Sequence, residues 1–238
     1  FANFPTTALS LSEQIKTSIE FFRRRFEAEK FIAYFQNATN TYASVADLKK
    51  AFDVIKQFPE IVGLSISTRP DCIDDEKLEL IAGYSNAYDV WIEYGLQSVN
   101  DATLKIINRS HTFSQFVDAV GMTARKNIKV SVHVILGLPG ECRDDMIKMA
   151  QTLSRLPIQG VKLHVLHVTR GTKLQQLYEE DKIKLLESDE YVCFVCDFLE
   201  HLNPAFVIMR LVSNAKPDLL LAPQWINQKQ KIIDAIHG

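Results

Sequence analysis

Five short apolar runs, rich in β-branched and aromatic residues, recur along the chain at intervals of about 30 to 40 residues. The runs cover residues 31–35, 61–66, 90–96, 130–136 and 161–168. Amphipathic segments typical of helices alternate with them, at residues 10–29, 44–57, 74–84, 113–126 and 144–155. Ser10 and Glu13 form a capping-box pattern at the first of these segments. Strands alternating with helices favour a parallel sheet with helical crossovers.

The two faces of these predicted strands differ in polarity, since successive side chains of a strand point to opposite sides. One face is apolar, with Val62, Leu64 and Ile66 in the second strand, and should lie under the helices. The other face carries Ser65, Ser67, Arg69, Glu93, Gln97, Ser131, His133, Lys162 and His164. A closed eight-stranded barrel fills its interior with branched apolar side chains, so a polar interior implies a wider barrel that holds water or ligand. The expected fold is α/β: an incomplete, open TIM-like barrel of five or six parallel strands with outer helices. The alternative is that the polar groups satisfy one another around ordered water.

The regular alternation of strand and helix patterns ends after residue 168. Helical patterns cover residues 174–185 and 189–202, a short apolar run covers 206–211, and a last helix is predicted from Trp225. We therefore expect two parts: the partial barrel over residues 1–170 and a C-terminal extension over 171–238 that packs on it.

Composition narrows the class of protein. The 27 basic and 29 acidic residues give a net charge of -2 without a long run of either sign, so nucleic acid is not indicated as a partner. No segment approaches the roughly 20 apolar residues that cross a bilayer, and we expect a cytoplasmic protein without membrane contact. The four cysteines do not form a disulfide framework and are expected to be reduced.

Three segments carry more than a periodic pattern: EYGLQS at residues 93–98, NRSHT at 108–112 and VHVILGLPGE at 132–141. In this order they resemble the fourth and fifth strands of radical S-adenosylmethionine (SAM) enzymes, in the branch of oxygen-independent coproporphyrinogen oxidase and the elongator-type catalytic subunits. STRPD at 67–71 and LAPQW at 221–225 resemble the uncharacterised bacterial YhcC-like subfamily. The resemblance extends from about residue 9 to 225.

This resemblance assigns cofactor contacts near the ends of the early strands. Gln36, Asn37 and Ala38 stand at the family's glycine-rich site for the methionine amino group, where this sequence lacks the glycines. An ordinary strand-ending turn is the alternative. Ser67 and Arg69 stand where relatives place polar groups near the cofactor, and Arg69 could equally form a structural ion pair.

Further contacts follow in the next two strands. The resemblance implies that Gln97 contacts the ribose or the methionine of SAM. It also implies that Arg109, which is expected one turn into the following helix, binds the methionine carboxylate. A solvent-exposed arginine on that helix is the alternative. His133 stands where relatives often carry an acidic residue that binds the ribose hydroxyls. It could equally be a core histidine. The resemblance implies that Ile135 and Gly137 form the apolar surface against which the adenine ring packs.

The resemblance also implies a [4Fe-4S] cluster and a reducing electron donor. Relatives hold the cluster with three cysteines spaced Cys-x3-Cys-x2-Cys, and this sequence has no such triplet. We expect the first strand and the cluster loop upstream of Phe1, no metal site within the chain, and no activity from this segment alone. Cys193 and Cys196 fit a helix as core thiols, and His164 and His167 are predicted to point to opposite faces of one strand.

The substrate is not readable from the residues. The polar face suggests a polar small molecule, with Glu93, Lys162 and His164 as the candidate catalytic side chains. Two other functions stay open: a metal-independent lyase or isomerase that uses Glu93, Lys162 and His133 as acid, base and electrophile, or a non-catalytic nucleoside-binding protein. In the lyase, Lys162 could also form a Schiff base.

Overall fold

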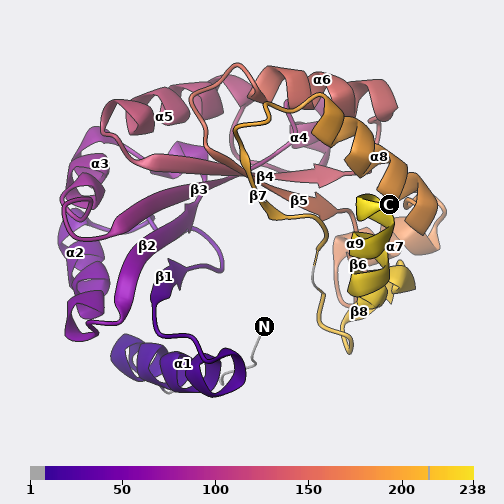
Figure 1. The fold of residues 1–238 in the computed structure, drawn as a ribbon. Helices are drawn as coiled ribbons and strands as arrows, with labels where there is room; N and C mark the ends of the chain where they lie inside the picture. The colour runs from indigo at the N-terminus through magenta and orange to yellow at the C-terminus, as the bar shows by residue number, and fades with distance from the viewer. Residues whose placement is uncertain (1–8, 214) are drawn as a thin grey trace. The chain divides into compact units, whose positions relative to one another are not determined.

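The computed structural model describes residues 9–213 and 215–238. The chain divides into two compact units. The first runs to Tyr94 and includes Asp118–Val130, and the second consists of Gly95–Val117 and Ser131–Gly238. The elements of both are labelled in Figure 1.

Six strands form one sheet in the order β1-β2-β3-β4-β5-β7. Their bounds are β1 Phe31–Phe35, β2 Ile61–Thr68, β3 Asp89–Gln97, β4 Lys129–Leu136, β5 Gly160–Val165 and β7 Val207–Arg210. The pairs β1–β2, β2–β3, β4–β5 and β5–β7 are all parallel. The predicted alternation of parallel strands with helices is confirmed.

The helices follow the predicted segments, with shorter bounds. They are α1 Leu11–Phe26, α2 Val45–Asp53, α3 Asp75–Ala82, α4 Asp101–Ile106, α5 Phe113–Arg125, α6 Arg143–Leu153, α7 Lys173–Glu179, α8 Ser188–Glu200 and α9 Lys229–His237. The capping box of Ser10 and Glu13 at the start of α1 is confirmed. The short helix α4 was not among the amphipathic segments, because six residues are too few to show a helical period. The helix that was expected to contain Arg109 ends at Ile106.

The first unit has its core on the apolar face of β2. Leu64 and Ile66 of that strand are fully buried, as are Leu78 and Ile81 of α3. Figure 1 shows α2 and α3 beside β1 and β2. Val62 was expected on this buried face and is instead 40% exposed, because the β1–β2 register passes from Ile61 to Gly63 and leaves Val62 in a bulge.

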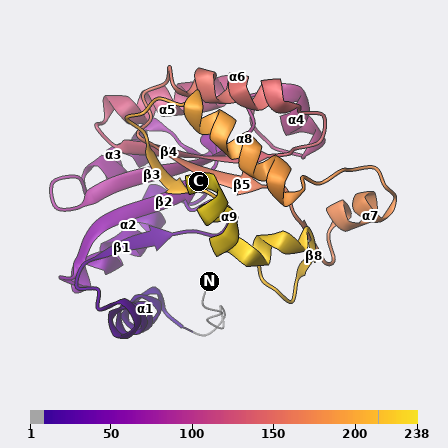
Figure 2. The ribbon, with the colours of Figure 1, turned by 45° about the vertical axis from the view of Figure 1, so that its right-hand side comes forward.

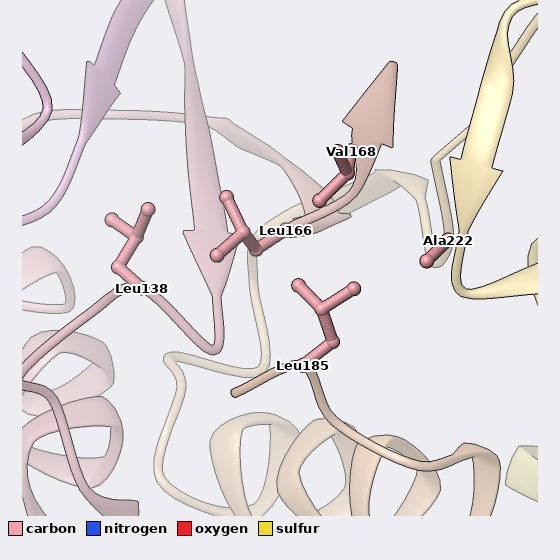
Figure 3. Packing of buried hydrophobic residues seen from close by; sticks show 5 residues of the cluster. All are labelled: Leu138, Leu166, Val168, Leu185 and Ala222. Carbon is pink, nitrogen blue, oxygen red and sulfur yellow. The ribbon is translucent and has the colours of Figure 1, made fainter. Parts of the chain in front are cut away.

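In the second unit, helix α8 contacts both α6 and α9 (Figure 2). A separate cluster of buried side chains, shown in Figure 3, consists of Leu138, Leu166, Val168, Leu185 and Ala222. It lies where β6 (Val168–Thr169) pairs with β8 (Leu220–Ala222) in a two-stranded antiparallel sheet. The predicted strand over 161–168 is therefore two strands, since β5 ends at Val165 and Val168 belongs to another sheet.

Within the described ranges, no helix combines the length and the apolar character needed to cross a membrane.

Candidate cofactor-binding site

A buried carboxylate marks the polar face of the strands in the first unit. Glu93 of β3 is 2% exposed, and its two oxygens accept hydrogen bonds from different strands. The Tyr34 hydroxyl of β1 donates to Oε2 at 2.8 Å, and Ser65 Oγ of β2 donates to Oε1 at 2.6 Å. The polar groups satisfy one another here, as one of the two sequence interpretations expected. Tyr34 was not predicted, although its alternation with apolar Phe35 was a readable signal.

The turn after β1 has backbone angles that favour glycine, although it contains no glycine. Asn37 and Ala38 follow Gln36 with φ of 74° and 56°, in the left-handed region. Asn40 fastens this turn to the end of β2: its backbone N–H donates to Ser67 O at 3.1 Å and its side-chain amide donates to the same oxygen at 2.9 Å. The assignment of this turn to the amino group of a ligand stays a prediction.

Arg69 forms the structural ion pair that was one of its two interpretations. Its Nε donates to Asp71 Oδ1 at 2.9 Å and a second guanidinium nitrogen lies 2.5 Å from Oδ2. Asp71 belongs to the 3₁₀ turn Pro70–Cys72 that follows β2. Two nitrogens of the Arg69 guanidinium group thus bind the Asp71 carboxylate, which belongs to the turn that directly follows Arg69.

The second unit contains a cavity of about 280 Å³ at the carboxyl ends of its strands. Its lining consists of Gln97, His133, Ile135, His164, Val165, Leu166 and His167. Gln97 ends β3 with φ of 77°. Three residues expected from sequence to contact the cofactor, Gln97, His133 and Ile135, thus line one cavity, together with the catalytic candidate His164.

The histidines of this cavity lie against each other. The His133 and His164 rings stack with centroids 5.2 Å apart and planes 21° apart. Burial is the largest cause that lowers the pKa of His164 to about 2, and repulsion from neighbouring basic groups, first His133 and then Arg210, contributes the rest. His164 Nε2 is buried and has no hydrogen-bond partner among the described residues. A neutral imidazole nitrogen is therefore free to meet a ligand inside the cavity.

His167 corrects one sequence prediction. We expected His164 and His167 to point to opposite faces of one strand, and both line the cavity. The reason is that β5 ends at Val165, so strand alternation does not apply to the next residues. His167 Nδ1 lies 3.1 Å from Val165 O.

Side-chain hydrogen bonds hold the loops that follow β3 and β4 in the second unit. Arg109 lies in the loop after α4 rather than within a helix as predicted, and its guanidinium donates to Gly95 O at 2.5 Å. Ser98 Oγ donates to Glu141, and burial raises the pKa of that carboxyl group. Gly137 has φ of 80°, a conformation that glycine adopts at low cost. The expected contacts of Arg109 and Gly137 with a cofactor stay predictions.

The cavity suits a polar ligand of the nucleoside type. The Gln97 amide both donates and accepts, His164 Nε2 lacks a partner, and Ile135 adds an apolar wall. The described residues do not suit an iron–sulfur cluster. Among them no group of three or more His, Cys, Asp or Glu side chains could hold a metal ion, and all four cysteines are free.

Comparison with known proteins identifies the family of the chain. The Radical SAM superfamily model matches residues 9–153, and the Radical_SAM C-terminal domain model matches residues 158–238. An uncharacterized protein of Methanocaldococcus jannaschii is 41% identical over 230 residues, which are 96% of this chain and 71% of that protein. Protein YhcC of Escherichia coli is 31% identical over 230 residues, which are 96% of this chain and 74% of YhcC.

Solved structures support the fold class. The Elp3 protein of Methanocaldococcus infernus superposes with a TM-score of 0.77 at 18% identity, over 94% of this chain and 58% of Elp3. Coproporphyrinogen III oxidase of Escherichia coli superposes with a TM-score of 0.56 at 14% identity, over 71% of this chain and 39% of the oxidase. The expected class, an incomplete TIM-like α/β barrel, is confirmed, and the chain belongs to the radical SAM superfamily.

Proposed function

We propose that this chain is the cofactor-binding body of a radical SAM oxidoreductase. The cavity at the ends of β3, β4 and β5, lined by Gln97, His133 and Ile135, carries the proposal. It lies in a chain that belongs to the superfamily, at the strand ends where barrels of this class place their active sites. Bound together, SAM and a [4Fe-4S] cluster supply a 5′-deoxyadenosyl radical, which removes a hydrogen atom from a substrate.

Each lining residue has a distinct part in binding. The Gln97 amide, which lines the cavity, donates to and accepts from ribose hydroxyls or the methionine end of SAM. His164 stays neutral through burial, so it meets the sulfonium cation without adding positive charge to the cavity. Ile135 covers the adenine. These groups hold the cofactor and exclude water from the reacting atoms.

The described part of the chain has no set of side chains that could hold a metal ion, so it does not itself supply ligands for the cluster. We propose that a reducing electron donor serves the cluster. The protein would work in the cytoplasm on a polar small molecule.

The test uses the full-length protein after anaerobic reconstitution with iron and sulfide. We expect a [4Fe-4S] spectrum and reductive cleavage of SAM to 5′-deoxyadenosine. Replacing Gln97→Ala should weaken SAM binding by about 1–3 kcal/mol, or roughly five- to a hundredfold, because a cavity hydrogen bond is lost. Gln176→Ala, an exposed glutamine of α7, is the matched control and should bind as the unmodified protein does. A protein without iron or cleavage after reconstitution refutes the proposed reaction.

A further inference from the structure

One imidazole of the cavity is oriented by the protein backbone. His167 lies two residues beyond the end of β5, and its Nδ1 is 3.1 Å from Val165 O. A carbonyl oxygen accepts hydrogen bonds and has no hydrogen to give, so Nδ1 carries the hydrogen of this bond and donates it. In a neutral ring the other nitrogen, Nε2, then holds a lone pair and is an acceptor.

The carbonyl group that selects this tautomer is itself held in place. Ser213 Oγ donates to Val165 O at 3.2 Å, and the same oxygen accepts from the Val165 backbone N–H at 2.9 Å. Ser213 is 1% exposed, so water does not compete for these bonds. The acceptor of the His167 hydrogen bond is therefore fixed before any ligand arrives.

The residues on either side of His167 are anchored as well. Leu166 donates its backbone N–H to Leu136 O at 3.0 Å, and Val168 pairs with Ala222 in the sheet of β6 and β8. The side chains of Leu166 and Val168 both belong to the buried cluster in Figure 3. Because both neighbours are fixed, the His167 ring is held at the wall of the cavity that it lines.

His167 differs from the other cavity histidines in what its ring can accept. Its Nε2 has no hydrogen-bond partner within residues 9–213 and 215–238. The His164 ring stacks on His133, and burial is the main reason that its pKa is only about 2. A base with so low a pKa takes up almost no protons near neutrality, whereas an imidazole in an ordinary environment does so readily.

We propose that His167 is the residue of this cavity that accepts a proton from the substrate, and that Ser213 positions it. The proton leaves an O–H or N–H group of the substrate, the bonding electrons stay on that oxygen or nitrogen, and an N–H bond forms at Nε2. Nδ1 keeps its hydrogen, so the imidazolium ring keeps its bond to Val165 O. The step needs no oxidant, reductant or further reactant.

This inference rests on the proposed function and names its substrate class. The substrate is a small molecule with a hydroxyl or amine group close to its reacting carbon, because both must lie within one cavity of about 280 Å³. A ring that only braces the backbone would need the Nδ1 bond and no reactive Nε2. The test therefore measures both nitrogens of His167.

Nuclear magnetic resonance of the full-length protein, with its histidines labelled with ¹⁵N, reads the tautomer at mildly alkaline pH. We expect hydrogen on Nδ1 of His167 and none on Nε2. His167→Gln identifies the signal by removing it, and His237→Gln, at the exposed end of α9, is the control that leaves it in place. A hydrogen on Nε2 of the unmodified protein overturns the inference.

The role of Ser213 is tested in the same spectra. Ser213→Ala removes the bond that fixes Val165 O, so both tautomers of His167 should appear. Ser85→Ala, at an exposed serine, is the matched control and should leave one tautomer. Circular dichroism would check that each variant is folded. A folded Ser213→Ala variant with the tautomer of the unmodified protein would overturn the positioning role.

Diethyl pyrocarbonate, which acylates neutral imidazole nitrogens, measures the reactivity of Nε2 in the full-length protein. Mass spectrometry of the peptides gives the rate at each histidine. We expect His167 to react as fast as exposed His237 and about tenfold faster than His164, whose Nε2 is buried. A rate at His167 as low as that at His164 would overturn the inference.

Repeating the spectra with saturating SAM and no reductant separates substrate from cofactor. We expect SAM to leave the Nε2 signal of His167 in place, because the proposal keeps this nitrogen for the substrate. A shift as large as a new hydrogen bond causes would make His167 a cofactor contact and overturn the inference. Failure to bind or cleave SAM, with the expected tautomer and reactivity, would instead count against the proposed function, so the two failures are distinguishable.

Discussion

Buried His164 should make the stability of the protein depend on pH in a way that one substitution removes. Burial and the surrounding positive charge lower its pKa in the folded state to about 2, while the unfolded chain has the ordinary value of 6.5. The unfolded state therefore binds a proton at a pH where the folded state does not. This contribution to stability is complete above pH 6.5 and is lost as the pH falls from there toward 2.

The size of the effect follows from these two values. Each pH unit below 6.5 costs about 1.4 kcal/mol, so lowering the pH from 7 to 5 should remove about 2 kcal/mol from the free energy of unfolding. That is a large share of the roughly 5–15 kcal/mol that stabilises a typical protein. His164→Gln keeps a polar side chain and cannot gain this proton. The variant should therefore lose about 2 kcal/mol less than the unmodified protein over the same interval.

Urea unfolding at pH 7, 6 and 5, followed by circular dichroism, measures this difference. Other groups titrate in both proteins, so the difference between the two curves isolates His164. Gln176→Ala, at an exposed residue of α7 that does not titrate, is the control and should leave the pH dependence as it is. If the free energies of the unmodified protein and His164→Gln fall in parallel from pH 7 to pH 5, His164 is not held neutral by its surroundings, and the description of the cavity is wrong.

Three further substitutions test the backbone and the buried network. Ala38→Gly should stabilise the protein by about 0.5–1 kcal/mol, since it relieves a left-handed φ of 56° at some entropic cost, and a higher urea midpoint would show it. Gly137→Ala should destabilise by about 1–3 kcal/mol, because the new Cβ would lie 2.8 Å from Leu186 at φ of 80°; an unchanged midpoint contradicts this. Tyr34→Phe should cost about 1–3 kcal/mol by removing a donor to buried Glu93, and thermal unfolding that matches the unmodified protein would show that the bond contributes nothing.

Much of the candidate cavity was predictable from strand alternation alone. A period of two placed Glu93 and His133 on the polar face and Leu64 on the buried one, and the structure agrees at each position. Alternation needs only local backbone geometry, so it can be read from consecutive residues. Val62 shows the limit, because a bulge arises from pairing with β1, which lies about 30 residues earlier in the sequence.

The sequence by itself determined the order of strands and helices, the polar face and the resemblance to radical SAM enzymes, since these depend on neighbouring residues. Only the tertiary structure decided that His167 lines the same cavity as His164, that Arg109 bonds to Gly95, and that Arg210 stands beside Lys162. Each of these depends on where a strand ends or on which distant strands pair. Those choices minimise the free energy of the whole packed chain, and no local pattern records them.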